Sequence, residues 1–104
     1  MGKLVPQRSR NDWLRLIRAA SADSGRVRLT RHARERMGER GVTLREVLNV
    51  VRRGLFDEPP SPALTPPGHW QARISDRSGV AVVIGFDPDG EPVILDVITV
   101  IRSH

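Results

Sequence analysis

Residues 30–54, TRHARERMGERGVTLREVLNVVRRG, decide the fold because they contain two helix signals separated by one glycine. Thr43 and Glu46 form a capping box at the start of the second signal, and Gly54 stands where a left-handed C-terminal cap is expected. Apolar residues follow at the i, i+3, i+4 and i+7 spacing of an amphipathic helix: Leu44, Val47, Leu48 and Val51. The pattern predicts a helix over residues 43–53.

The first signal is shorter and is bounded by two residues that favour helix ends. Thr30 is a good N-terminal cap, and Gly41 stands where a helix would stop. Ala33 and Met37 are spaced by four residues, as an inward-facing pair on one helical turn would be. These residues predict a short helix between Thr30 and Gly41.

The other face of this first helix is the candidate functional surface. It presents His32 and Arg36 at i and i+4, with Arg40 one turn further along. A histidine beside arginines can move protons next to a bound anion. The structural alternative is that His32, at the start of a helix, only forms a hydrogen bond with a neighbouring strand or loop.

Length and composition limit what such a site can do. The 104 residues suit one compact domain, and the absence of cysteine excludes disulfides and thiolate metal sites. No apolar run approaches the roughly 18–20 residues of a membrane span, and residues 1–10 lack the apolar centre of a signal peptide. We expect a cytoplasmic protein with a flexible basic arm at residues 1–10 and a single domain at residues 11–104.

Charge is distributed unevenly along the chain. Residues 1–54 contain 14 basic and 5 acidic side chains, whereas residues 55–104 contain 3 and 7. Sixteen of the seventeen basic residues are arginine, whose planar guanidinium suits bidentate phosphate contacts and stacking on bases. Two interpretations follow. Either the basic half contacts nucleic acid, or it reflects coding bias and its charges only solvate helix faces.

The segment before this stretch carries another helical stripe. Apolar residues again recur at i, i+3, i+4 and i+7: Trp13, Leu16, Ile17 and Ala20. Because Trp13 lies on this stripe, we interpret it as a core anchor rather than a platform for base stacking. Residues 21–25, SADSG, break the helix, and Val27 and Leu29 then alternate with arginines as in a short strand.

The second half reads as a proline-rich connector followed by three strands. Residues 57–68, DEPPSPALTPPG, contain five prolines, which excludes a helix or a central strand. We expect an extended connector that is either a spacer or the wall of a binding groove. Residues 70–75, 80–86 and 93–101 have strand patterns separated by turn sequences. The sequence thus predicts an α+β domain with two or three helices packed on one face of a small antiparallel sheet.

The last of these strands, residues 93–101, is apolar on both sides and is expected to lie centrally under helices. Asp96 is the exception, because a buried carboxylate needs a hydrogen-bonded or charged partner. We favour a pairing with an arginine over a catalytic role. Strict alternation would place four other side chains on the same face as Asp96: Ile94, Ile98, Val100 and Arg102.

One motif resembles a known family. The string T-x-H-A-x-x-R-M-x-x-R-G-V at residues 30–42, followed by a second helix and a strand containing V-I-T-V, resembles a small bacterial family catalogued only as a domain of unknown function. That family is grouped with the MqsR and RelE type toxin ribonucleases. The resemblance covers residues 27–102 and implies a RelE/MqsR-like fold, mRNA-interferase activity in a toxin–antitoxin system, RNA as substrate and a cognate antitoxin protein as partner.

The resemblance also implies roles for residues of the sheet. The pair Trp70-Gln71 resembles a Trp-Gln in MqsR-like toxins, where the glutamine belongs to the active site. Arg102 matches the position at which those toxins place a basic catalytic residue. They generally employ lysine and tyrosine too, whereas this chain has no tyrosine and Lys3 as its only lysine. Their mechanism therefore does not transfer directly.

The residues that remain permit metal-independent RNA cleavage. The 2′-hydroxyl is a nucleophile within the substrate, so the protein need only transfer protons and stabilise charge on the phosphate. We expect His32 to act as base or acid and Arg36 to hold the phosphate, with Gln71 and Arg102 completing the catalytic set. His69 and His104 are alternative second proton carriers. Four further arginines are expected to bind nucleic acid: Arg31, Arg34, Arg40 and Arg73.

Other classes of site and function have different sequence requirements. The three histidines and Asp96 have no local metal-ligand spacing, so we expect neither a metal nor a cofactor. Phosphate-loop, zinc-protease and α/β-hydrolase motifs are absent from the sequence. A non-catalytic RNA- or DNA-binding module would use the same arginine-rich face, and a protein-interaction subunit would set those arginines against an acidic partner. Catalysis and binding differ in whether replacing His32 removes a reaction or only affinity.

Overall fold

The computed structural model describes residues 8–103. Residues 1–7 of the expected basic arm and His104 lie outside this range, and Ser9 and Arg10 form the beginning of the first helix. In chain order the elements are α1 (Arg10–Ser21), the 3-10 turn η1 (Ser24–Arg26), β1 (Val27–Leu29), α2 (Arg31–Arg40), α3 (Leu44–Arg53), β2 (Leu55–Pro62), β3 (Trp70–Ser75), β4 (Val80–Phe86) and β5 (Leu95–Arg102).

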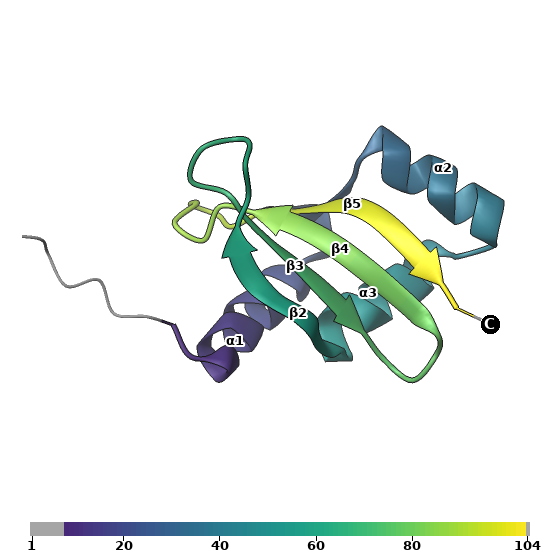
Figure 1. Cartoon of the computed structure of the whole chain (residues 1–104), viewed down its shortest axis with the longest axis horizontal. Coiled ribbons are helices and arrows are strands. Elements are labelled where there is room, and N and C mark those ends of the chain that lie inside the picture. The colour runs from purple at the N-terminus through teal and green to yellow at the C-terminus, as the bar shows by residue number, and fades with distance from the viewer. Residues whose placement is uncertain (1–7, 104) are drawn as a thin grey trace, which may run out of the picture.

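The five strands form one sheet in the order β1-β5-β4-β3-β2. Strands β2 to β5 lie side by side in Figure 1. Strands β2 to β5 are antiparallel neighbours, which confirms the meander, whereas β1 runs parallel to β5. The α+β class is confirmed, but the sheet is mixed instead of purely antiparallel. The central strand is β4. The last strand, β5, was expected to be central. It is an inner strand next to β4, but it has only the three-residue β1 on its outer side.

Strand β2 corrects the expectation for the proline-rich segment. Its residues pair with β3 through a ladder interrupted by two irregularities, one between Phe56 and Glu58 and one between Glu58 and Ser61. Prolines fit here because β2 is an edge strand, where a missing N–H on the outer side removes no ladder hydrogen bond. Only residues 63–69 remain as the connecting loop.

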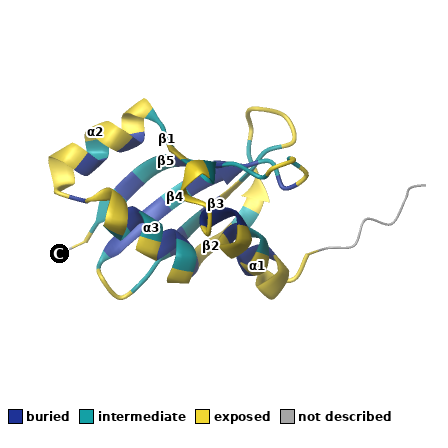
Figure 2. Ribbon diagram, turned by 180° about the vertical axis from the view of Figure 1, so that it is seen from behind, coloured by how far each residue is buried: buried dark blue, intermediate teal, exposed yellow. Residues whose placement is uncertain are grey.

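Helices α1 and α3 lie across one face of the sheet and turn their exposed residues away from it (Figure 2). Trp13 on α1 is 8% exposed, and its ring centroid lies 4.9 Å from that of Trp70 and 5.8 Å from that of Phe86. Its expected role as a core anchor is therefore confirmed. Among residues 8–103, no helix has the length and apolar character needed to span a membrane.

Helix α3 has the predicted bounds and capping box, but it buries a different stripe. Val47, Val50 and Val51 are fully buried, whereas Leu44 is 48% exposed and Leu48 only partly buried. The helix is rotated because it packs against α1 on one side and against β3 and β4 on the other. Both contacts are made by the valine side of the helix. The stripe predicted from spacing alone was therefore half wrong.

Gly54 ends α3 for a reason other than the expected one. Its φ of −72° is not left-handed. A Cβ built there would lie 2.6 Å from Ile74 Cγ2 and from the carbonyl oxygen of Val50. The chain therefore needs glycine because β3 approaches the helix end closely, and the prediction of a left-handed cap was wrong.

A bulge in β5 changes which residues share a face of the sheet. Val83 pairs with Thr99 and Ile84 with Val97, so Ile98 is the extra residue. Ile98 packs toward the helix-free face, where its Cδ1 atom would lie 3.0 Å from a Cβ built on Gly85. Val97 and Val100 are both buried on the helix-covered face, three residues apart. The alternation expected from Asp96 to Arg102 is therefore broken at Ile98.

The observed orientation of α3 leads to a stability prediction. Val47→Ala removes two buried methyl groups and should lower the free energy of unfolding by about 2 kcal/mol. Leu44→Ala acts on a half-exposed side chain and should change it by less than about 0.5 kcal/mol. Urea denaturation of both variants measures the difference. Equal losses would show that α3 does not pack through its valine side.

Candidate functional site

Helix α2 is held in place by residues at its two ends. The Thr30 side chain accepts a hydrogen bond from the Ala33 N–H, and its hydroxyl donates to the carbonyl oxygen of Val97 at 2.8 Å. Gly41 adopts a left-handed conformation with φ of 63°. Ala33 and Met37 are buried against β5. The predicted caps and inward pair of this helix are confirmed.

His32 and Arg36 lie side by side on α2, as their spacing predicted. Arg36 Nε donates to His32 Nε2 at 3.4 Å, and Arg36 Nη1 donates to the carboxylate of Glu39. His32 is exposed and Arg36 is partly exposed. The imidazole is therefore open to solvent beside a guanidinium, and a carboxylate already holds the guanidinium from its other side.

The geometry of α2 determines which way this pair points. Ala33 and Met37 face inward, and Arg34 on one flank of the helix lines a groove together with Leu48 of α3. Successive helix positions differ by about 100°, so residues 32 and 36 lie on the flank opposite Arg34. That flank is directed away from α3 and toward the sheet face that α1 and α3 leave uncovered.

We call this uncovered side the open face of the sheet. Strand alternation and the bulge assign to it the following residues: Gln71, Arg73, Val83, Gly85, Asp96, Ile98 and Thr99. Gln71 is exposed and lies level with Gly85 and Asp96 across three strands. Arg73 Nε lies 3.4 Å from Asp57 Oδ2. Gln71 and Arg73 are thus on the side of the sheet to which His32 and Arg36 are directed.

Asp96 forms the arginine pair that we favoured. Its Oδ1 accepts from Arg28 Nε at 3.1 Å, from the strand that runs parallel to its own. The two residues lie opposite each other in the register of β1 and β5. Asp96 therefore has a structural ion-pair partner on the open face.

Arg102 lies apart from the other proposed catalytic residues. It pairs with Val80 in the sheet register, on the helix-covered side, and its Nη2 atom donates to Glu46 Oε2 at 2.7 Å and to the Gly41 carbonyl oxygen at 3.2 Å. The bulge at Ile98 causes this placement. The structure thus brings His32 and Arg36 together and holds Arg102 against α3, while no hydrogen bond or ion pair among residues 8–103 joins Gln71 to any of them.

The arginines expected to bind nucleic acid have different surroundings. Arg31 is 94% exposed, with its Nε 3.4 Å from Glu35 Oε1. Arg34 is exposed and has no ion pair among residues 8–103. Arg40 instead donates to the carbonyl oxygen of Val100, at the outer edge of β5. Arg40 is therefore engaged in the fold, whereas Arg31 and Arg34 can accept an outside ligand.

Two carboxylates near the site were missed by the sequence reasoning. Glu39 holds Arg36, and Glu46 holds Arg102. The spacing of three residues between Arg36 and Glu39 on one helix is a local signal that could have identified the first pair. The second pair joins α3 to β5 across 56 residues of sequence, and no local pattern indicates it.

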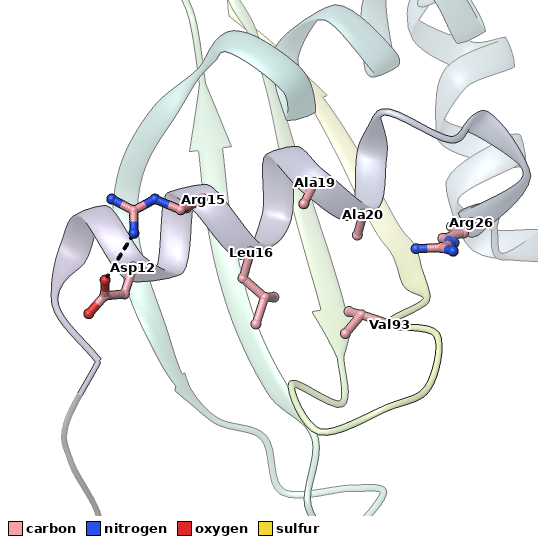
Figure 3. Close-up of a pocket in the computed structure, with 7 residues that line it drawn as sticks. All are labelled: Asp12, Arg15, Leu16, Ala19, Ala20, Arg26 and Val93. Carbon is pink, nitrogen blue, oxygen red and sulfur yellow. Dashed lines mark ion pairs between the residues drawn. The ribbon is translucent and has the colours of Figure 1, made fainter.

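A pocket of about 350 Å³ lies between α1 and the loop before β5 (Figure 3). Leu16 and Val93 form part of its apolar lining, and Arg15 at its rim is 3.8 Å from Asp12. Its lining includes no histidine, so it lacks a group that transfers protons near neutral pH. Among residues 8–103, no three His, Asp or Glu side chains are grouped as metal ligands would be.

The Glu46 carboxylate generates a prediction about acid stability. The Thr43 backbone N–H lowers the pKa of Glu46 below its ordinary value of 4.5, burial opposes this effect, and Arg102 lowers the pKa further. Such a group stabilises the fold above its ordinary pKa, and the contribution disappears as the pH falls through the lowered folded pKa. Glu46→Gln should therefore flatten the loss of stability below about pH 4.5.

Urea denaturation at a series of acid pH values measures this loss. Glu91→Gln is the matched control, because Glu91 is exposed and forms no ion pair among the described residues. The control should keep the acid dependence of the wild type. The same dependence in Glu46→Gln and in the wild type would contradict the prediction.

Comparison with known proteins gives one match. The family model described as "Domain of unknown function (DUF4258)" matches residues 29–102, which is most of the chain and includes α2, α3 and all of β2 to β5. No curated protein and no solved structure matches.

Proposed function

We propose that this chain, which belongs to the DUF4258 family, is a toxin-like bacterial endoribonuclease that acts in the cytoplasm without a metal or other cofactor. Likeness to the MqsR and RelE type toxins is part of this proposal and rests on the sequence motif. The substrate is single-stranded RNA, bound over the outer flank of α2 and the adjoining open face of the sheet.

One observation supports the proposal most directly. His32 Nε2 and Arg36 Nε are 3.4 Å apart on a solvent-facing helix flank. A phosphate that replaces Glu39 as the partner of Arg36 would lie within proton-transfer reach of the imidazole. His32 then takes the proton of the 2′-hydroxyl, and Arg36 stabilises the negative charge that develops on the phosphate. As the bond between the 2′-oxygen and phosphorus forms, the bond between phosphorus and the 5′-oxygen breaks, and the leaving 5′-oxygen takes a proton from solvent water. The products are a 2′,3′-cyclic phosphate and a 5′-hydroxyl.

The sheet contributes to substrate binding in this proposal. Gln71 is exposed on the open face and has an amide that can donate to and accept from a base or phosphate. Arg73 is partly exposed beside it, although Asp57 offsets its charge. We assign Arg102 no contact with RNA, because Glu46 and Gly41 already accept hydrogen bonds from its guanidinium.

A non-catalytic RNA- or DNA-binding module is the second candidate. The pairing of Arg36 with Glu39 favours binding over catalysis, since Glu39 offsets the positive charge that would stabilise the charge developing on the phosphate. The position of Arg102 also favours it, because no second cation joins His32 and Arg36 from β5. Such a module would bind RNA through the same flank of α2 and leave it uncut.

The cleavage reaction gives the decisive prediction. A mixed RNA pool incubated with the protein in EDTA should be cut to products with 2′,3′-cyclic phosphates, while DNA of the same sequence stays intact. His32→Ala should lower the rate by roughly 10²–10⁴-fold. Arg36→Ala should weaken both binding and turnover and reduce the salt dependence of binding.

Two further variants make the assay specific. His69→Ala removes a half-buried loop histidine and should leave the rate within about twofold of the wild type if His32 alone transfers the proton. Glu39→Gln frees Arg36 and should increase affinity for RNA. Full activity in His32→Ala, or a requirement for added metal, would reject the ribonuclease. RNA binding without cleavage would support the non-catalytic binding module instead.

We also propose a protein partner of the antitoxin type. The expected contacts are acidic residues over the exposed arginines of α2, Arg31 and Arg34 among them, with Arg36 and Arg40 nearby. Purification from the native host should yield a complex with the product of a neighbouring gene. A free monomer, together with no protective effect of any neighbouring gene on growth, would contradict this proposal.

A further inference from the structure

Helix α3 carries more apolar surface than the chain itself covers. Its valine side packs on α1 and the sheet, whereas Leu44 is 48% exposed and Leu48 is only partly buried. The two leucines are four residues apart and therefore adjacent on one flank of the helix. The part of this leucine pair that remains exposed would contribute favourable burial only if a partner covered it.

This flank forms one wall of a groove of about 370 Å³. Val27 and Leu29 of β1 line the opposite wall, and both are only partly buried. The groove therefore has leucine on one side and strand residues on the other. Apolar walls of this kind suit the apolar side chains of a protein better than the charged backbone of a nucleic acid.

The charges around the groove are positive. Arg28 and Arg34 line it, Arg45 follows Leu44 on the solvent side of α3, and no acidic residue is part of the lining. Arg28 is paired with Asp96. Arg34 and Arg45 form no ion pair within residues 8–103, so both can bind carboxylates supplied from outside.

We propose that the groove between α3 and β1 is the docking site for an acidic amphipathic segment of a partner protein. Apolar side chains of that segment lie against Leu44 and Leu48, and its carboxylates pair with Arg34 and Arg45. The leucines supply affinity through burial, and the arginines select for negative charge. A basic segment of the same hydrophobicity is excluded by repulsion.

This site lies on the flank of α2 opposite His32 and Arg36. The inference rests on the proposed existence of a protein partner, but it does not depend on RNA cleavage. Docking in the groove leaves the His32 flank uncovered, so variants of Leu44 and Leu48 and variants of His32 have separate effects. The test of RNA cleavage can therefore fail while the test of peptide binding succeeds. Peptide binding can likewise fail while RNA cleavage succeeds.

The test is selection from a display library of random 16-residue peptides against the full chain. Enriched peptides should combine several Asp or Glu residues with Leu, Ile or Val at helical or strand spacing. Their affinity should fall at least tenfold for the double variant Leu44→Ser/Leu48→Ser and should fall with rising salt. Leu64→Ser is the matched control, because Leu64 is 99% exposed and lies in the loop before β3, outside the groove.

Charge is tested separately by Arg34→Ala, with Arg77→Ala in the β3–β4 turn as its control. Arg34→Ala should weaken the enriched peptides several-fold, and Arg77→Ala should leave them unchanged. Circular dichroism and urea denaturation verify that each variant is folded. No enrichment, enriched peptides without net negative charge, or binding unchanged in the double variant would each overturn the proposal. RNA affinity lost in the leucine variant would assign the groove to RNA instead.

Discussion

The outer edge of β5 is the constraint on which the arrangement of this domain depends. A strand edge without a neighbour leaves carbonyl groups unpaired, and burial makes them costly. β1 pairs only with residues 95–97. At the end of this ladder the Thr30 hydroxyl donates to the Val97 carbonyl oxygen, and beyond it Arg40 donates to the Val100 carbonyl oxygen. Thr30 caps the start of α2 and Arg40 is its last residue. The hydrogen bonds that complete the strand edge therefore also fix the rotation of the helix.

The fixed rotation of α2 separates its surface into two flanks with different chemistry. One flank carries His32 and Arg36. The other carries Arg34 and meets the apolar groove beside α3. The proposed proton transfer on RNA and the proposed docking of a protein segment therefore involve different sides of one ten-residue helix. Within the DUF4258 family, this arrangement gives a physical reason to test the two functions separately.

The basic charge of the chain serves structure as well as ligand binding. Arg28, Arg40 and Arg102 are each directed to a carboxylate or carbonyl oxygen of the fold. Arg34 and Arg45 have no ion pair within the described residues, which leaves them available to outside anions. Net charge therefore overstates the surface available to nucleic acid, and the location of each guanidinium decides its use.

Local sequence by itself determined the helices, both caps of α2, the capping box of α3, the inward pair of α2 and the adjacency of His32 and Arg36, because these features depend on residues within one or two turns. Only the tertiary structure decided the rest. Packing against α1 and the sheet rotated α3 and left Leu44 outside. Pairing with β3 placed the first prolines of the proline-rich segment in the edge strand β2. The bulge at Ile98, which depends on register with β4, moved Arg102 away from the face of Gln71, and no alternation within one strand encodes such an insertion.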